Sequence, residues 1–107
     1  MTNEEIQKIE SQKEEAELAI KKGEALKRLR DNADYQLVIQ EGYLSDYPKE
    51  LAEAIAKNTG AYDTDKLVTL LRGTNGLVGY QFQVGANYNA ALQTLDSLKE
   101  LIESEEE

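Results

Sequence analysis

The chain has 107 residues, of which 40% are hydrophobic and 31% charged, and its formal net charge at pH 7 is −9. It contains no Cys and no His, which excludes disulfides, thiolate nucleophiles, Cys/His zinc sites and imidazole acid–base catalysis. The composition predicts one helical domain over residues 1–107, without catalytic residues, metal or cofactor.

The first predicted helix runs from the N-terminus to about Arg30. Thr2 and Asn3 are N-cap candidates, and the two Glu residues that follow favour the first turn. Apolar residues keep heptad spacing at Ile6, Ile9, Ala16 and Ile20, but Lys13 and Gly23 interrupt the pattern. The apolar face is therefore thin, which is typical of a surface helix or of one arm of a coiled hairpin.

Two short central helices are expected next. The polar residues at 31–34 supply a break and new N-cap candidates, and a short helix is predicted from Asp34 to about Leu44. The sequence Ser-Asp-Tyr-Pro at 45–48 predicts a second break, followed by a helix to Lys57 with one apolar face. Residues 58–60 predict the stop of that helix, and residues 63–65 the N-cap of the next.

The segment from Leu67 to Ile102 carries the longest pattern. Its seam positions alternate between spacings of three and four: Leu67, Leu70, Thr74, Leu77, Gln81, Val84, Tyr88, Ala91, Leu95, Leu98 and Ile102. Polar Thr74 and Gln81 would set the register. One continuous helix would span roughly 54 Å, whereas a compact domain of this length has a diameter of about 35 Å. We therefore expect a long partner helix, a second subunit or a break.

Four glycines lie inside this segment, at positions 73, 76, 79 and 85. Each costs about 1 kcal/mol relative to Ala in a helix interior, and Asn75-Gly76 is a turn signal. Two alternatives follow: a kink or short interruption at 73–76, or a helix in which Gly76 and Gly79 permit close approach of another helix. Because the seam keeps its phase through this region, a continuous or only kinked helix is the preferred interpretation. The acidic residues 103–107 are expected to fray, because acids oppose the dipole at a helix C-terminus. The whole predicts an all-α, elongated, antiparallel helical arrangement.

Aromatic residues at positions 80, 82 and 88 alternate with Gln and Asn, and no Lys or Arg occurs between residues 73 and 98. Stacking on nucleic-acid bases is therefore disfavoured, and a polar–aromatic face that meets another protein is the preferred interpretation. The predicted interface combines seam and aromatic positions: Leu77, Tyr80, Val84, Tyr88, Ala91, Leu95, Leu98 and Ile102.

The charge is unevenly distributed. Residues 1–30 carry seven acids and seven bases, whereas residues 31–107 carry fourteen acids and five bases. This balance disfavours nonspecific binding to nucleic acid. No apolar signal region is visible at the start, and no window approaches about 18 apolar residues. We therefore expect no contact with a membrane.

Residues 23–43 read GEALKRLRDNADYQLVIQEGY, and residues 73–92 read GTNGLVGYQFQVGANYNAAL. The first stretch resembles a pattern in small, acidic, helical proteins of tailed bacteriophages. The second is similar to their C-terminal helix, which bears glycines and spaced aromatics, although Asn75-Gly76 and Gly79 depart from it. The resemblance implies a virion structural or assembly protein, made in the bacterial cytoplasm and bound in multiple copies to the head or head–tail connection. Its partners would be capsid or portal proteins, or further copies of itself.

Two alternatives remain open. Small size and a net charge of −9 also favour an acidic phage inhibitor that mimics DNA and binds a host defence or DNA-handling protein. Six of the twenty-one acids fall between residues 96 and 107, whereas a mimic needs carboxylates spread over its surface. A carboxylate metal enzyme is the third class, and neither an Asp cluster nor a Gly-rich phosphate loop supports it.

Overall fold

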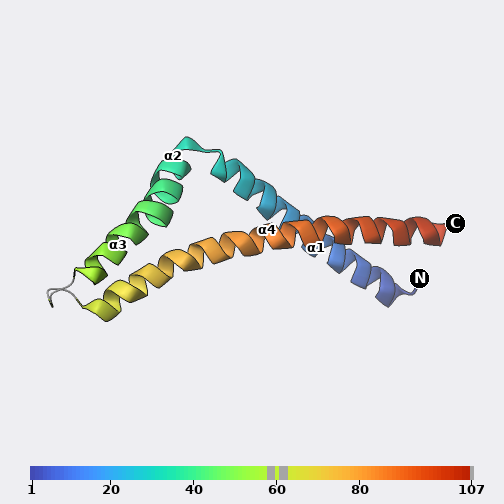
Figure 1. Cartoon of the computed structure of the whole chain (residues 1–107). Coiled ribbons are helices and arrows are strands. Elements are labelled where there is room, and N and C mark those ends of the chain that lie inside the picture. The colour runs from blue at the N-terminus through green and yellow to red at the C-terminus, as the bar shows by residue number, and fades with distance from the viewer. Residues whose placement is uncertain (58–59, 61–62, 107) are drawn as a thin grey trace. The chain divides into compact units, whose positions relative to one another are not determined.

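The computed structural model describes residues 1–57, 60 and 63–106, and within them every regular element is a helix (Figure 1). The elements are α1 (Asn3–Arg30), α2 (Ala33–Tyr35), the π-helix η1 (Gln36–Asp46), α3 (Tyr47–Ala56) and α4 (Thr64–Glu106). The predicted all-α class is confirmed. Two compact units form: Met1–Lys27 with Gln83–Glu107, and Arg28–Phe82.

A capping box starts α1. The Thr2 amide donates to Glu5 Oε2 and the Glu5 amide donates to Thr2 Oγ1, both at 3.2 Å. This reciprocal pair satisfies two backbone donors that the first turn leaves unpaired. The prediction of Thr2 as N-cap is confirmed, as is the end of the helix at Arg30.

The polar break after α1 is also confirmed. Asn32 Oδ1 accepts from the Tyr35 amide at 3.0 Å and so caps α2. Gln36 Nε2 donates to the backbone oxygen of Arg30 at 2.6 Å. These two side chains therefore form hydrogen bonds with backbone groups at the end of α1 and at the start of α2 that would otherwise be unpaired.

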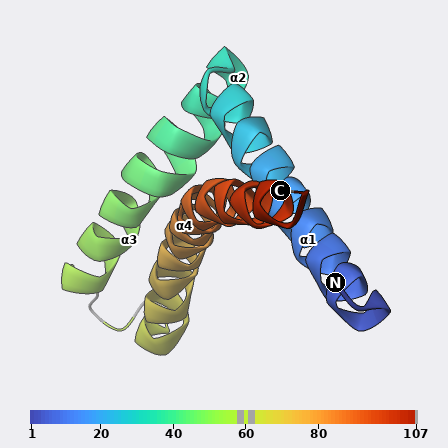
Figure 2. The same ribbon diagram turned by 90° about the vertical axis from the view of Figure 1, so that its right-hand side faces the viewer.

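The break predicted at 45–48 is contradicted. Figures 1 and 2 show an uninterrupted helical ribbon from α2 to α3, and Asp46 has a helical backbone without a side-chain capping bond. The Tyr47 amide donates to the oxygen of Gly42, five residues earlier. A proline ring clashes with the carbonyl four residues before it. The wider π-helical turn relieves this crowding just before Pro48, so the helix continues.

The connection between α3 and α4 agrees with the predicted stop at residue 60 and with the N-cap predicted at residues 63–65. Gly60 takes a positive φ of 93°, whereas residues 58 and 59 of the predicted stop lie outside the described residues. Asp63 Oδ1 accepts from the amides of Asp65 at 3.0 Å and Lys66 at 3.4 Å, which caps α4.

The long C-terminal helix is continuous. α4 runs from Thr64 to Glu106 as one α-helix that contains all four glycines, so the preferred interpretation of a continuous helix is confirmed. It includes residues 103–106, which were expected to fray. Within the described residues, no helix is both long and apolar enough to span a bilayer.

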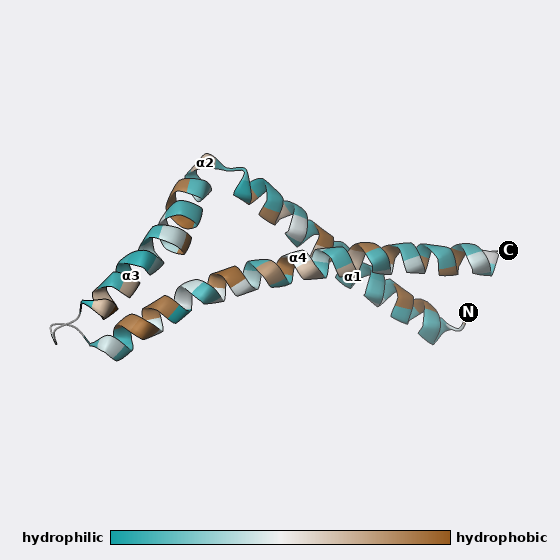
Figure 3. Ribbon diagram, in the orientation of Figure 1, coloured by the Kyte–Doolittle hydropathy of each residue, from teal (hydrophilic) through white to brown (hydrophobic). Residues whose placement is uncertain are grey.

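The small core follows the predicted seam. The buried residues of α4 are Thr74, Gln81, Val84, Ala91 and Leu98, and all five are seam positions. The other buried hydrophobic side chains are Ala16 of α1 and Leu51 of α3. Figure 3 shows the complementary pattern, since α1 is mostly hydrophilic and α4 carries more apolar turns.

Candidate protein-interaction surfaces

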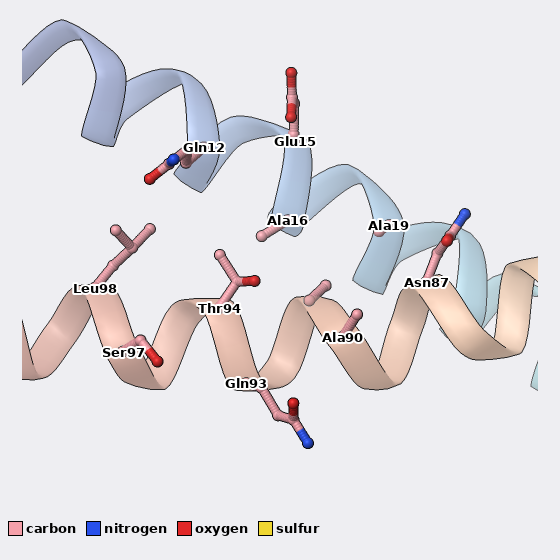
Figure 4. Close-up of a pocket in the computed structure, with 11 residues that line it drawn as sticks. Gln12, Glu15, Ala16, Ala19, Asn87, Ala90, Gln93, Thr94, Ser97 and Leu98 are labelled. Atoms are coloured by element: carbon pink, nitrogen blue, oxygen red, sulfur yellow. The ribbon is translucent and has the colours of Figure 1, made fainter.

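The first unit pairs α1 with the C-terminal part of α4 in antiparallel orientation. Gly23 lies against Tyr88, and at the other end the Met1 amino group lies 3.9 Å from Glu105 Oε2. Figure 4 shows Ala16 pointing from α1 toward α4, and Leu98 pointing back toward α1. Val84, Ala91 and Leu98 of the predicted interface are thus already buried within the chain.

The two helices approach each other closely at Gly23. A Cβ built there would lie 2.5 Å from Tyr88 Cδ2, 2.6 Å from Cγ and 2.7 Å from Cβ. Lys27 sits one turn further along α1, with Nζ 4.4 Å from the centroid of the Tyr88 ring and 3.4 Å from its hydroxyl. The glycine that interrupts the apolar pattern of α1 is therefore the position that admits an aromatic ring from α4.

A groove of about 640 Å³ runs along one side of this pair (Figure 4). Its lining includes several small residues: Ala16 and Ala19 on α1, and Ala90, Ala91 and Thr94 on α4. Small side chains allow two helices to approach closely, but they leave little apolar surface in the contact itself. The groove therefore offers few reactive or charged groups. Its one acidic group is Glu15, and the other polar groups are amides and hydroxyls.

A second groove of about 390 Å³ is lined by α1 and by the C-terminal part of α4. Its apolar floor contains Leu95, Leu98 and Ile102, and charged side chains of both helices surround it. Leu95 is half-buried and Ile102 is 36% exposed. These two predicted interface residues therefore remain accessible in part.

In the second unit, seam residue Gln81 joins α1, α2 and α4. Arg30 Nη2 donates to Gln81 Oε1 at 3.2 Å, and Gln81 Nε2 donates to the Tyr35 hydroxyl. Gln81 is 8% exposed, so its amide is almost fully withdrawn from water and both ends are bonded. Its predicted role in fixing register agrees with this geometry, since a shift of α4 would break both bonds.

Thr74, the other polar seam residue, is also buried and bonded. Its hydroxyl donates to the backbone oxygen of Leu71 at 2.7 Å. One turn further along α4, Leu77 of the predicted interface is half-buried. Thr74 therefore needs no partner from another helix.

One exposed apolar surface of the second unit lies on α4. Phe82 is 76% exposed, Tyr80 60% and Val78 37%. They belong to the run from residue 73 to residue 95, which contains no Asp, Glu, Lys or Arg although 31% of the chain is charged. Large apolar side chains on an uncharged surface are characteristic of a place where another protein binds.

The glycines beside these side chains are open. A Cβ at Gly76 or Gly79 would meet nothing within 4 Å. Each glycine still costs about 1 kcal/mol of helix stability relative to Ala. Within the described residues, neither Gly76 nor Gly79 therefore serves close helix approach, which was one of the two alternatives for them.

The predicted aromatic patch is thus divided. Tyr88 packs inside the first unit and Gln81 inside the second, while Tyr80 and Phe82 face solvent. Phe82 belongs to the polar–aromatic face that was expected to meet another protein, but the predicted interface residues included Tyr80 and otherwise only seam positions, so Phe82 and Val78 were not among them. The signal that identifies them is an apolar residue off the seam of an otherwise amphipathic helix.

Within the described residues, no group of three or more Asp or Glu side chains is placed to hold a metal ion. Comparison of the chain with protein-family models, with curated proteins and with solved structures gives no match. The features that bear on function are therefore the exposed surface of α4 and the resemblance in residues 23–43 and 73–92.

Proposed function

We propose that the chain is a non-enzymatic assembly protein of a tailed phage virion, bound in multiple copies to the head or head–tail connection through α4. The observation that carries the proposal is the exposure of Tyr80 and Phe82 on an uncharged stretch of helix. In a chain with a net charge of −9, leaving this stretch uncharged and aromatic lowers solubility unless another protein covers it.

Three further features support a binding role. The buried residues are few and mostly small, so intramolecular packing uses little of the apolar surface. Aromatic side chains are the usual anchors of protein interfaces, because they bury a large area with few rotatable bonds. The resemblance to small tailed-phage proteins includes residues 73–92, which contain both exposed aromatics.

The chemistry of residues 73–95 points to a class of partner. Residues 73–95 offer neither cations for phosphate groups nor acids for a basic surface. The surface therefore fits an uncharged, partly apolar surface of another protein, such as a capsid or portal subunit or a second copy of the chain.

The test is to count copies of the chain in particles of the phage that encodes it. Targeted mass spectrometry with isotope-labelled peptides would be applied to purified virions and to precursor heads. We expect several copies per particle in at least one of the two. A non-structural protein of equal abundance in the lysate measures carry-over. Levels no higher than that control in both kinds of particle would overturn the proposal.

A further inference from the structure

We propose that Asn75 and Gly76 of α4 form a site of spontaneous deamidation, at which the Asn75 amide becomes a carboxyl group through a cyclic imide. The sequence Asn-Gly supplies both reacting groups, and none of the other asparagines of the chain is followed by glycine. Both residues are exposed, and a Cβ at Gly76 would meet nothing within 4 Å, so among the described residues no side chain obstructs the ring. This chemistry does not depend on the proposed function.

The reaction consumes only water. The Gly76 backbone nitrogen gives its proton to water or hydroxide and attacks Cγ of Asn75. A bond forms between this nitrogen and Cγ, the bond from Cγ to the side-chain nitrogen breaks, and ammonia leaves. Water then opens the five-membered imide. Attack on Cγ yields aspartate, whereas attack on the backbone carbonyl carbon yields isoaspartate, in which the main chain runs through Cβ and Cγ.

The stability of the helix at this turn sets the rate. In α4 the Gly76 N–H donates to the backbone oxygen of Arg72, four residues earlier, so the nitrogen attacks only when the turn opens. Glycines at positions 73, 76 and 79 each destabilise the helix relative to Ala. A Cβ at Gly79 would also meet nothing within 4 Å, so packing at this position does not compensate. The turn therefore opens more readily than the glycine-free turns of α4 that follow residue 85.

Asn87 on the same helix is an internal comparison. Its Oδ1 accepts from Gln83 Nε2 at 2.9 Å, and the residue after it is Tyr88, whose ring packs against α1. Its amide is therefore held in place and the next backbone nitrogen is crowded. In the part of the chain that the structure describes, the side chain of Asn75 makes no hydrogen bond. Both the local sequence and the local contacts therefore select Asn75.

Either product alters α4 beside its exposed aromatic residues. Aspartate at position 75 would be a charge within residues 73–95, which otherwise have none, on the same side of the helix as Val78 and Phe82. Isoaspartate adds one atom to the main chain, so the ladder of hydrogen bonds between residues four apart is interrupted at residue 75. The continuous form of α4 therefore belongs to the unmodified chain.

The test is prolonged incubation of the purified full chain at mildly alkaline pH. Peptide mass spectrometry and labelling by isoaspartyl methyltransferase locate the products. We expect Asn75 to convert before Asn87 and Asn89, and to convert faster when the chain is unfolded in guanidinium chloride, because the turn then has no helix to leave. Earlier conversion of Asn87 or Asn89 would overturn the site. So would an intact Asn75 in the folded chain after the unfolded chain has converted completely.

Gly79→Ala tests the dependence on helix opening, because it leaves both reacting residues unchanged. Conversion of Asn75 should slow about 5-fold, the factor that about 1 kcal/mol of helix stability gives, and hydrogen exchange of the Gly76 amide should slow equally. Gly85→Ala is the matched control, since its Cβ would also meet nothing within 4 Å but it lies more than two turns from Gly76, and it should change neither rate. A Gly79→Ala chain that converts as fast as wild type, or equal slowing by both variants, would overturn local opening at this site.

Discussion

Gly23→Ala tests the α1–α4 contact more sharply than any other single substitution. In most helix interiors this change adds about 1 kcal/mol of stability, because Ala is the better helix former. At Gly23 the new Cβ would lie 2.5 to 2.7 Å from three carbons of Tyr88. Carbon atoms in contact prefer about 3.5 to 4.0 Å. One of the three is the Tyr88 Cβ, so rotating the ring is not enough and the two helices must separate locally.

The expected change in the free energy of unfolding is the balance between the steric clash with Tyr88 and the gain in helix propensity. Overpacking of a well-packed contact costs about 1 to 3 kcal/mol, and separation also weakens the interaction between Lys27 and the Tyr88 ring. After the gain in helix propensity, we expect a net destabilisation of about 1 kcal/mol. Gly85→Ala is the control, because it lies on α4 of the same unit and its Cβ would meet nothing within 4 Å. It should stabilise by about 1 kcal/mol.

The assay is thermal unfolding followed by circular dichroism. A difference of about 2 kcal/mol between the two variants corresponds to roughly 8 °C or more in Tm for a domain of this size. Tyr88→Ala in the Gly23→Ala background removes two of the three close atoms, so the double variant should lose less than the sum of the two single changes. Equal stabilisation by Gly23→Ala and Gly85→Ala would refute the contact.

Three further predictions concern the seam and the tail. Gln81→Ala should destabilise the chain by about 1 to 2 kcal/mol in urea unfolding, because it removes both bonds of a buried amide; an unchanged midpoint would contradict this. Leu98→Asp should unfold the first unit at a much lower temperature than Leu92→Asp, since Leu98 is 9% and Leu92 42% exposed, and equal midpoints would argue against the seam. Deletion of residues 103–107 should leave incorporation into particles intact, whereas a DNA mimic that depends on the tail would lose its partner.

Periodicity predicted much of this architecture because α4 repeats the same spacing of three and four residues between buried positions over many turns. The spacing of the C-terminal seam identifies Val84, Ala91 and Leu98 as buried, and they are. Capping chemistry is equally local. Thr2 and Glu5 form the capping box that their spacing of three allows, and Asp63 caps α4 as its position before the helix suggests. Such features depend only on neighbours in sequence, so sequence patterns capture them.

The central helical segment was less predictable because a wider helical turn competes with a break. The order Ser-Asp-Tyr-Pro at 45–48 is typical of a cap, yet the π-helix carries the chain through it and α3 begins at Tyr47. The turn brings the rings of Tyr43 and Tyr47 to a centroid separation of 5.9 Å, a stacked contact that a break would remove. Local sequence propensity does not include the energy of the contact between Tyr43 and Tyr47, so it favours the cap at residues 45 and 46.

Tertiary contacts determine the structural role of each glycine. Gly23 and Gly79 both interrupt helices, yet one receives the ring of Tyr88 and the other faces open space. The sequence does not distinguish them, because the distinction depends on which residue of a distant helix lies opposite. The exposure of Phe82 likewise depends on which side of α4 the rest of the chain covers.

The proposed role of the chain is virion assembly through the exposed Phe82 of α4. Its most direct test is competition, with wild-type and Phe82→Gln chains expressed together during infection and their ratio measured in purified particles by mass spectrometry. We predict that particles favour the wild-type chain at least about 5-fold over its share in the lysate. Leu37→Gln is the control, because Leu37 is 64% exposed but lies on η1, and it should show no such bias. Equal incorporation of wild-type and Phe82→Gln chains would contradict the claim.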